Sequence, residues 1–121
     1  MSGALRLGVG SAGGVVTGAG GWVLLGRAWQ SCDIGVNGAA NSFPLALVFF
    51  GLTAVATLWW WFALSRFVRR GGVLLGPLCA VVGSLLLVWG TLAWLHAPAD
   101  YPAPFCPPDN VPPWWPELLP L

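Results

Sequence analysis

The sequence contains no lysine, and charged side chains of either sign are scarce. Five arginines and four acidic residues amount to 7% of the 121 residues, whereas 57% are hydrophobic. Soluble domains carry about a quarter of their residues as charges, so this composition excludes an ordinary soluble domain. It is typical of a membrane protein. The lipid bilayer is therefore the first expected partner, and no nucleic acid is expected.

The side chains that mark proton relays and ion paths are absent from the long apolar stretches of the chain. Residues 7–26, 45–64 and 73–95 contain no Asp, Glu, Lys, Arg or His. Intramembrane charges usually accompany ion-coupled or proton-coupled transport, so their absence argues against a transporter of that kind.

Histidine and cysteine are also too few for a conventional metal or thiol site. His96 is the only histidine, and prolines separate it from Asp100 and Cys106, which leaves a zinc site without a fourth ligand. No C-x-x-C motif occurs, which argues against a thiol oxidoreductase. We therefore expect no catalytic residues, no cofactor and no metal, and we do not expect an enzyme.

What the chain does have is three apolar stretches long enough to cross a bilayer. About 20 residues of helix at 1.5 Å rise match a hydrocarbon core roughly 30 Å thick. The sequence predicts an all-α membrane protein with three transmembrane helices near 7–26, 45–64 and 73–95. Residues 1–96 would form the transmembrane domain, and residues 97–121 an extended proline-rich extracytoplasmic tail.

The first stretch has an unusual composition, because eight of its twenty residues are glycine. In water this would weaken a helix, but an unpaired backbone costs more in lipid, so the helix should persist. A cleaved signal peptide is the alternative, with Arg6 as its positive region and residues 17–21 as its cleavage site. Because the apolar run continues through Leu25 to a full span, an uncleaved first helix is favoured.

Arginines cluster in the short segment 65–72, at Arg66, Arg69 and Arg70. Short loops rich in arginine stay on the cytoplasmic side, so this turn predicts a cytoplasmic N-terminus and an extracytoplasmic C-terminus. A multi-pass protein of the plasma membrane is expected. Under this topology Arg27 is the one arginine that falls on the extracytoplasmic side. The acidic residues all fall on the extracytoplasmic side as well: Asp33, Asp100, Asp109 and Glu117.

Local signals predict where the helices end. Residues 27–44 are rich in turn formers and lack apolar periodicity, which predicts an outer loop with Pro44 in the first turn of the second helix. Trp59, Trp60, Trp61 and Phe62 precede the arginines and predict an inner aromatic belt at the lipid headgroups. Pro77 is harmless if the third helix begins beside it and bends that helix if it begins several residues earlier. The sequence leaves this point open.

Small residues repeat every four positions in the first and third stretches. Such rows let two helices approach backbone to backbone. We expect the row of the first helix to pack against the row of the third. The residues concerned are Gly10, Gly14 and Gly18 in the first, and Gly76, Ala80 and Ser84 in the third.

The segment 97–121 holds nine of the eleven prolines, so neither a helix nor a central strand is expected and a polyproline-like course is predicted. Apolar side chains alternate with the prolines. Such a segment would lie on the membrane interface or on the outer ends of the helices. The alternative function is a docking strip for a partner protein, with Trp114 and Trp115 as its contacts.

A disulfide between Cys32 and Cys106 follows from the topology. Both cysteines lie outside the spans on the oxidising side of the membrane, whereas Cys79 lies inside the third span. About six and eleven residues of chain separate the two cysteines from their helices, enough at about 3.3 Å per residue to bring them together.

Two functions remain open from the sequence. The first is a non-catalytic accessory or assembly subunit of a larger membrane complex, whose partners are other integral membrane proteins. The alternative is a small channel or transporter component formed by association with copies of itself, with a pore lined by backbone and hydroxyl groups. The hydroxyls available for such a pore are those of Thr17, Thr53, Thr57 and Thr91.

Overall fold

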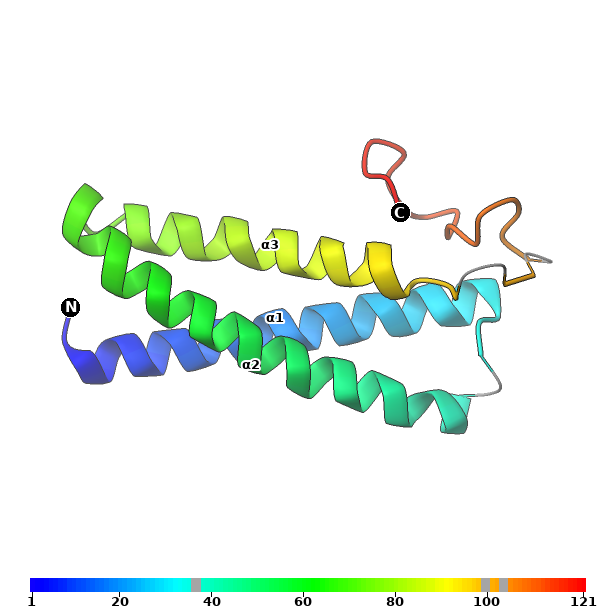
Figure 1. Cartoon of the computed structure of the whole chain (residues 1–121), viewed down its shortest axis with the longest axis horizontal. Coiled ribbons are helices and arrows are strands. Elements are labelled where there is room, and N and C mark those ends of the chain that lie inside the picture. Colours follow the sequence, from blue (N-terminus) through cyan, green and yellow to red (C-terminus); the bar gives the residue numbers. More distant parts are fainter. Residues whose placement is uncertain (36–37, 99–100, 103–104) are drawn as a thin grey trace.

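The computed structural model describes residues 1–35, 38–98, 101–102 and 105–121. Within that part of the chain three helices run up, down and up: α1 (Gly3–Cys32), α2 (Gly38–Gly71) and α3 (Leu75–Leu95). Each is long enough and apolar enough to cross a membrane, as the sequence predicts. Figure 1 shows the N-terminus at the same end of the bundle as the turn between α2 and α3, with the C-terminal segment near the other end.

The first two helices extend well beyond the predicted spans. Most of the segment 27–44 is helical, because α1 continues to Cys32 and α2 begins at Gly38, so the expected long loop is wrong. The segment 65–72 is not a turn either, since α2 continues through it to Gly71. Hydropathy measures how much of a helix is apolar. A helix ends only where the backbone conformation changes.

Left-handed backbone conformations end these two helices. Asp33 has φ of 53°, and its N–H donates to the carbonyl of Trp29, which also accepts from the N–H of Ile34 at 2.8 Å. Gly72 has φ of 79° and follows the last residue of α2. Glycine adopts this conformation without the steric cost that a Cβ atom would bring.

The prolines of α2 and α3 differ in their consequences. α3 begins at Leu75, and its first backbone bond runs from the N–H of Leu78 to the carbonyl of Leu74 at 3.1 Å. Pro77 therefore lies in the first turn, where no intrahelical donor is needed, and it does not interrupt the helix. Pro44, in contrast, lies inside α2 and not in its first turn, because α2 begins earlier than predicted.

The glycine row of α1 packs against α2, so the expected contact with the third helix is wrong. A Cβ atom on Gly14 would lie 2.9 Å from the Cα of Thr57, and one on Gly18 would lie 3.0 Å from the carbonyl oxygen of Phe49. Gly10 faces the same helix, and a Cβ atom on it would lie 3.6 Å from the N atom of Trp61. The threonines of α2 are small enough to meet the bare backbone of α1.

The small residues of α3 also contact α2. A Cβ atom on Gly76 would lie 3.3 Å from the carbonyl oxygen of Ala63. The carbonyl of Ala80 accepts from Nε1 of Trp59 at 3.2 Å, and Oγ of Ser84 accepts from Nε1 of Trp60 at 2.8 Å. Both rows of small residues are therefore used to pack against the middle helix.

These contacts correct the expected aromatic belt. The indole of Trp59 lies over Gly83 of α3, and that of Trp60 lies over Gly13 of α1. An indole fills the space that a glycine leaves, and its N–H finds an acceptor on the opposite helix. Trp61 and Phe62 are exposed, by 51% and 49% of their surfaces, as belt residues would be.

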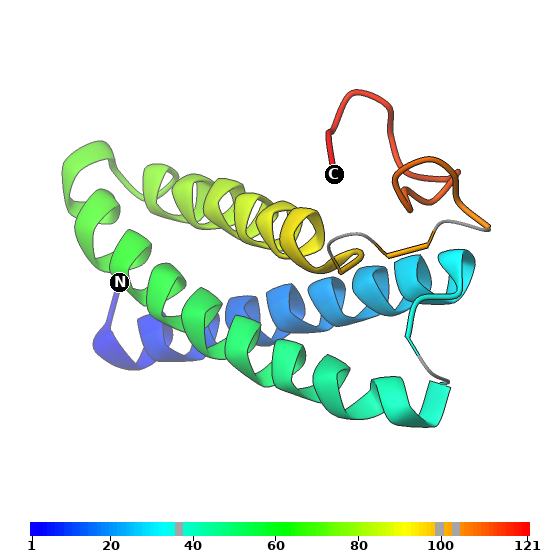
Figure 2. The same cartoon turned by 45° about the vertical axis from the view of Figure 1, so that its right-hand side comes forward.

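α1 and α3 meet toward the end where α1 terminates. Nε1 of Trp29 donates to the carbonyl of Leu95 at 2.9 Å, so the last turn of α1 lies beside the end of α3. Leu25 and Leu92 are fully buried on this side. Figure 2, turned by 45° from Figure 1, keeps α1 and α3 side by side at this end.

Candidate functional site

The disulfide Cys32–Cys106 joins the last residue of α1 to the C-terminal segment, as predicted. The two Cα atoms are 5.3 Å apart, and 74 positions separate the residues in the chain. Both cysteines are buried, with Ile34 beside them and the partly buried Trp29 and Tyr101 packed around. Cys79 is free and half-buried. We call this part of the molecule the disulfide end.

The described part of the C-terminal segment makes successive turns, so the predicted polyproline-like course is wrong. Backbone N–H groups of Asn110, Trp115 and Leu119 donate to carbonyls three or four residues earlier in the chain. Proline presets the φ angle of a turn's second residue, and a segment this rich in proline therefore turns readily once another element anchors it. The disulfide supplies that anchor.

Hydrogen bonds hold the segment against the end of α1. The hydroxyl of Tyr101 donates to the carbonyl of Asp33 at 3.2 Å and accepts from the N–H of Gly35 at 3.1 Å. Asn110, 4% exposed, donates from Nδ2 to the carbonyl of Tyr101 at 3.1 Å. A buried polar side chain bonded in this way favours one conformation of the backbone around it.

His96 belongs to the same network. Its Nδ1 lies 3.2 Å from the carbonyl oxygen of Leu92, and its Nε2 lies 3.3 Å from that of Asp109. Asp100 lies outside the described residues. In residues 1–35, 38–98, 101–102 and 105–121, no group of three or more His, Cys, Asp or Glu side chains could hold a metal ion.

The two tryptophans predicted as docking residues differ in their surroundings. Nε1 of Trp114 donates to Oγ of Ser31 at 2.9 Å, and the residue is 43% exposed. It borders a cavity of about 360 Å³ that Arg27 and Gln30 also line. Trp115 donates to the carbonyl of Leu119 at 2.6 Å, and the rings of Trp114 and Trp115 meet edge to face.

The chain's last residues return along α3. Nε1 of Trp89 donates to the carbonyl of Pro120 at 2.9 Å, and Figure 1 shows the C-terminus beside α3. Trp89 lies six residues before the end of α3, about 9 Å along the helix axis. The large apolar side chains of this segment that point outward form what we call the tail surface: Phe105, Trp114, Leu118 and Leu119.

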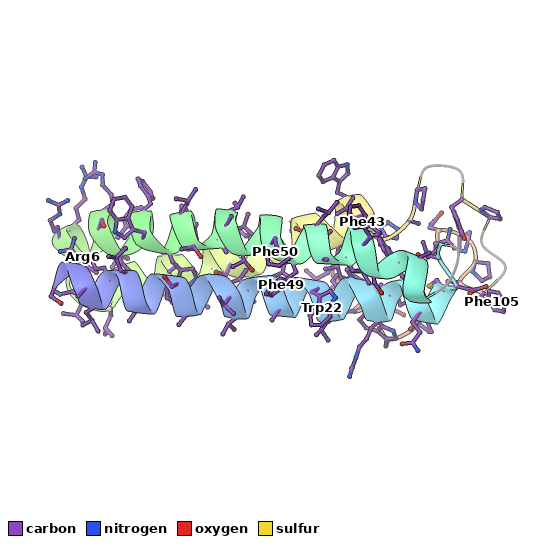
Figure 3. All side chains as sticks on the ribbon, turned by 90° about the horizontal axis from the view of Figure 1, so that it is seen from below. Arg6, Trp22, Phe43, Phe49, Phe50 and Phe105 are labelled. Carbon is purple, nitrogen blue, oxygen red and sulfur yellow. A yellow bond between two sulfur atoms is a disulfide. The ribbon has the colours of Figure 1, made fainter. Side chains whose placement is uncertain are left out.

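The opposite end carries the arginines. Arg66, Arg69 and Arg70 are exposed on the last two turns of α2, and Nε of Arg69 donates to the carbonyl of Ser65 at 2.9 Å. Figure 3 shows Arg6 at this end and Phe105 at the other. We call this the arginine end. Cations at a helix C-terminus also interact favourably with the helix dipole.

The threonines named as pore candidates do not lie together on an outer face. Thr17, 6% exposed, donates to the carbonyl of Gly13 at 2.7 Å, and Thr91 donates to that of Leu87 at 2.7 Å. Thr53 and Thr57 face the glycines of α1. The hydroxyls of Thr17 and Thr91 are therefore bonded within their own helices, and those of Thr53 and Thr57 lie between α1 and α2.

Comparison with known proteins adds no relative: no family model, no curated protein and no solved structure matches the chain. The class of protein is defined by the fold alone. It is a bundle of three helices, each with the length and composition of a membrane span, and a disulfide ties its C-terminal segment to α1.

Sequence reasoning missed two features of the site. The first is that Trp59 and Trp60 cross to α3 and α1, and the second is a groove between α2 and α3, described below. Both depend on which residues face each other across helices. Gly13 and Gly83 were the available signal, since a bare backbone accommodates an indole. Their partners, Trp60 and Trp59, lie 47 and 24 positions away in the chain and on another helix.

Proposed function

We propose that the protein is a non-catalytic subunit or assembly factor of a membrane complex, and that the tail surface binds another integral membrane protein. One observation carries this proposal. The C-terminal segment is held in place by a disulfide and by hydrogen bonds, yet Leu118 is 94% exposed and Phe105 is 65% exposed. An ordered segment that presents large apolar side chains is typical of an interaction surface.

The chemistry of the tail surface fits a protein partner. Tryptophan is enriched among the residues that dominate binding energies at interfaces. The bond from Trp114 to Ser31 orients the indole before a partner arrives, which lowers the entropy lost on binding. We assign Trp114 and Leu118 as the main contacts, with Trp115 supporting the ring of Trp114.

The membrane surface is the competing occupant of the tail surface. The contact between Trp89 and Pro120 lies at a level of α3 that is expected to be within the bilayer, and tryptophan favours the headgroup region. A pore gains less support. The threonine hydroxyls that would line it bond to their own helix or pack inside the bundle.

The proposed topology puts the arginine end in the cytoplasm of the cell and the disulfide end outside the plasma membrane. Four of the five arginines lie at one end of the bundle, and arginine in short loops is retained on the cytoplasmic side. A disulfide at the opposite end is consistent with an oxidising compartment there.

We expect a reporter fused at Gly71 to be cytoplasmic and one fused after Leu121 to be external. Replacing Arg66, Arg69 and Arg70 with Glu should weaken or scramble this orientation, because the retained positive charge is lost. Activity of paired cytoplasmic and external reporters measures the outcome. Replacing Arg27 with Glu is the control and should leave the orientation unchanged. An external reading at Gly71 in the parent chain would refute the topology.

The proposed function predicts a complex that depends on the tail surface. Purification in a mild detergent with native mass determination should show the chain bound to a larger, unrelated membrane protein. Trp114→Ala should weaken that complex by about 30-fold, the effect of losing a dominant interface contact worth about 2 kcal/mol. Leu118→Ala tests the same surface without removing a hydrogen bond of the chain.

Leu7→Ala is the matched control, because Leu7 is 60% exposed near the start of α1, at the end of the bundle opposite the tail surface. It should leave the complex intact. A lone monomer, or equal losses for Leu118→Ala and Leu7→Ala, would contradict the proposal. A complex of identical chains that survives both variants would favour the oligomeric alternative.

A further inference from the structure

An apolar groove of about 640 Å³ runs between α2 and α3 and is open to the outside of the bundle. Its volume lies within the range of small-molecule sites. Gly83 has no side chain and Cys79 a short one, so α3 leaves room beside the indole of Trp59. The residues that line the groove include Val55, Trp59, Phe67, Leu78, Cys79 and Val82.

The face of α2 that lines this groove also carries two of the arginines. Arg66 follows Trp59 by seven residues and Arg70 follows it by eleven, so both return to within about 20° of the direction of Trp59. Arg69 is turned about 80° away from that direction, to the side opposite Phe67, which lines the groove. Arg66 and Arg70 are exposed, so their guanidinium groups are free to reach a ligand at the end of the groove.

The length of α2 from the groove to the arginines matches the thickness of one leaflet of a bilayer. Val55 and Arg66 are eleven residues apart, which is about 16 Å along α2. Half of a hydrocarbon core is about 15 Å thick. A ligand with its charged group at Arg66 would therefore have about one leaflet's length of apolar groove beside its tail.

No acidic residue of the chain lies in the helical segment that carries the arginines or next to it in the sequence. All four acidic residues, Asp33, Asp100, Asp109 and Glu117, belong to the connection after α1 or to the segment after α3. The groove is uncharged. An occupant that complements the whole site must therefore be apolar along its length and anionic at one end.

We propose that this groove binds one acyl chain of an anionic glycerophospholipid, whose phosphate is held by Arg66 and Arg70. Guanidinium groups bind phosphate oxygens with two parallel hydrogen bonds, and basic sites beside transmembrane helices attract anionic lipid headgroups. The lipid site lies toward the opposite end of the molecule from the tail surface. The lipid proposal therefore does not depend on the proposed protein partner.

A second copy of the chain fits the site less well. Two copies with the same orientation in the membrane that met through this face would bring their Arg66 and Arg70 side chains together. Like charges repel at such an interface, whereas a lipid phosphate neutralises them. Charge complementarity therefore favours the lipid.

The first test measures lipid binding to the full chain by native mass spectrometry in detergent, with phosphatidylglycerol and phosphatidylcholine of the same acyl chains. Phosphatidylglycerol should bind more tightly. R66Q/R70Q should weaken its binding by roughly 30-fold, about fivefold for each arginine. Arg69→Gln is the control, because it removes a neighbouring charge that points away from the groove. Equal binding of the two lipids, or equal losses in the variant and control, would overturn the proposal.

The second test locates the lipid. Cys79 lines the groove and is the cysteine outside the disulfide, so N-ethylmaleimide labels it alone in unreduced protein. Phosphatidylglycerol should slow this labelling in the parent chain and in Arg69→Gln, but not in R66Q/R70Q. Labelling that is unaffected by bound phosphatidylglycerol would place the lipid elsewhere and overturn the proposal.

Filling the groove gives an independent comparison. Val82 lines the groove and is 49% exposed, whereas Val81 is 45% exposed and is not among the lining residues. Val82→Trp should weaken phosphatidylglycerol binding by about tenfold, and Val81→Trp should leave it unchanged. If Val82→Trp instead converts a dimer to a monomer while lipid binding is unaltered, the occupant is a second copy and the lipid proposal is wrong.

Discussion

Replacing Gly14 with leucine is expected to force α1 away from α2 and to lower the free energy of unfolding by about 3 kcal/mol or more. A Cβ atom on Gly14 would lie 2.9 Å from the Cα of Thr57, and the backbone of α2 cannot rotate away as a flexible side chain could. The helices would have to separate along the whole contact. Unfolding by a denaturing detergent, followed by circular dichroism, measures the loss.

Gly20→Leu is the matched control for this prediction. Gly20 lies on the same helix, and nothing comes within 4 Å of the position that its Cβ atom would take. The substitution should change the free energy of unfolding by about 0.5 kcal/mol or less, as at most surface positions. Leu24→Ile should also be mild. Similar small losses for all three variants would show that the glycine row does not determine the packing.

Removing the disulfide is expected to have the second large effect. Cys32→Ser or Cys106→Ser should lower the free energy of unfolding by up to about 4 kcal/mol, because the bond closes a long loop that encloses α2 and α3. Insertion of the helices in the membrane already restricts the unfolded chain, so this value is a ceiling. The C-terminal segment should become sensitive to proteases, since Tyr101 and Asn110 lose the anchor between them and α1.

Thiol counting checks the bond directly. Unreduced protein should expose only Cys79 to an alkylating reagent, and reduction should expose Cys32 and Cys106 as well. Cys32→Ser should free Cys106 without reduction. Cys79→Ser is the control and should leave the protease resistance of the segment unchanged. If Cys32 and Cys106 both label readily in unreduced membranes, the cross-link is absent and the tail surface loses its anchor.

These two predictions bear on the proposed function in different ways. Gly14 lies inside the bundle, so its substitution should weaken the bundle as a whole. Loss of the disulfide should act first on the C-terminal segment, and a partner bound at Trp114 and Leu118 should dissociate while the three helices remain assembled. A partner retained by Cys106→Ser would indicate that it binds a lipid-facing helix surface and not the tail surface.

The sequence alone determined that three helices of this chain can cross a membrane. Span length depends on bilayer thickness, and uncharged runs of about 20 residues meet that requirement whatever their neighbours are. It also determined the disulfide pair. With Cys79 inside a span, only Cys32 and Cys106 lay outside the predicted spans, and these two are bonded. The expected connection between the first helix and Cys32 is wrong, because Cys32 is the last residue of α1 and only the segment after α3 has to reach it.

Only the tertiary structure decided which helix the small residues meet. The spacing of Gly10, Gly14 and Gly18 identifies a flat face but carries no information about its partner, and the partner is α2 because threonines of α2 lie opposite. The rotation of α2 likewise sends Trp59 to Ala80 and Trp60 to Ser84 and leaves an open groove beside Cys79. Hydropathy reports how much apolar surface a helix has. The direction in which each side chain points is set by contacts between helices that are distant in the sequence.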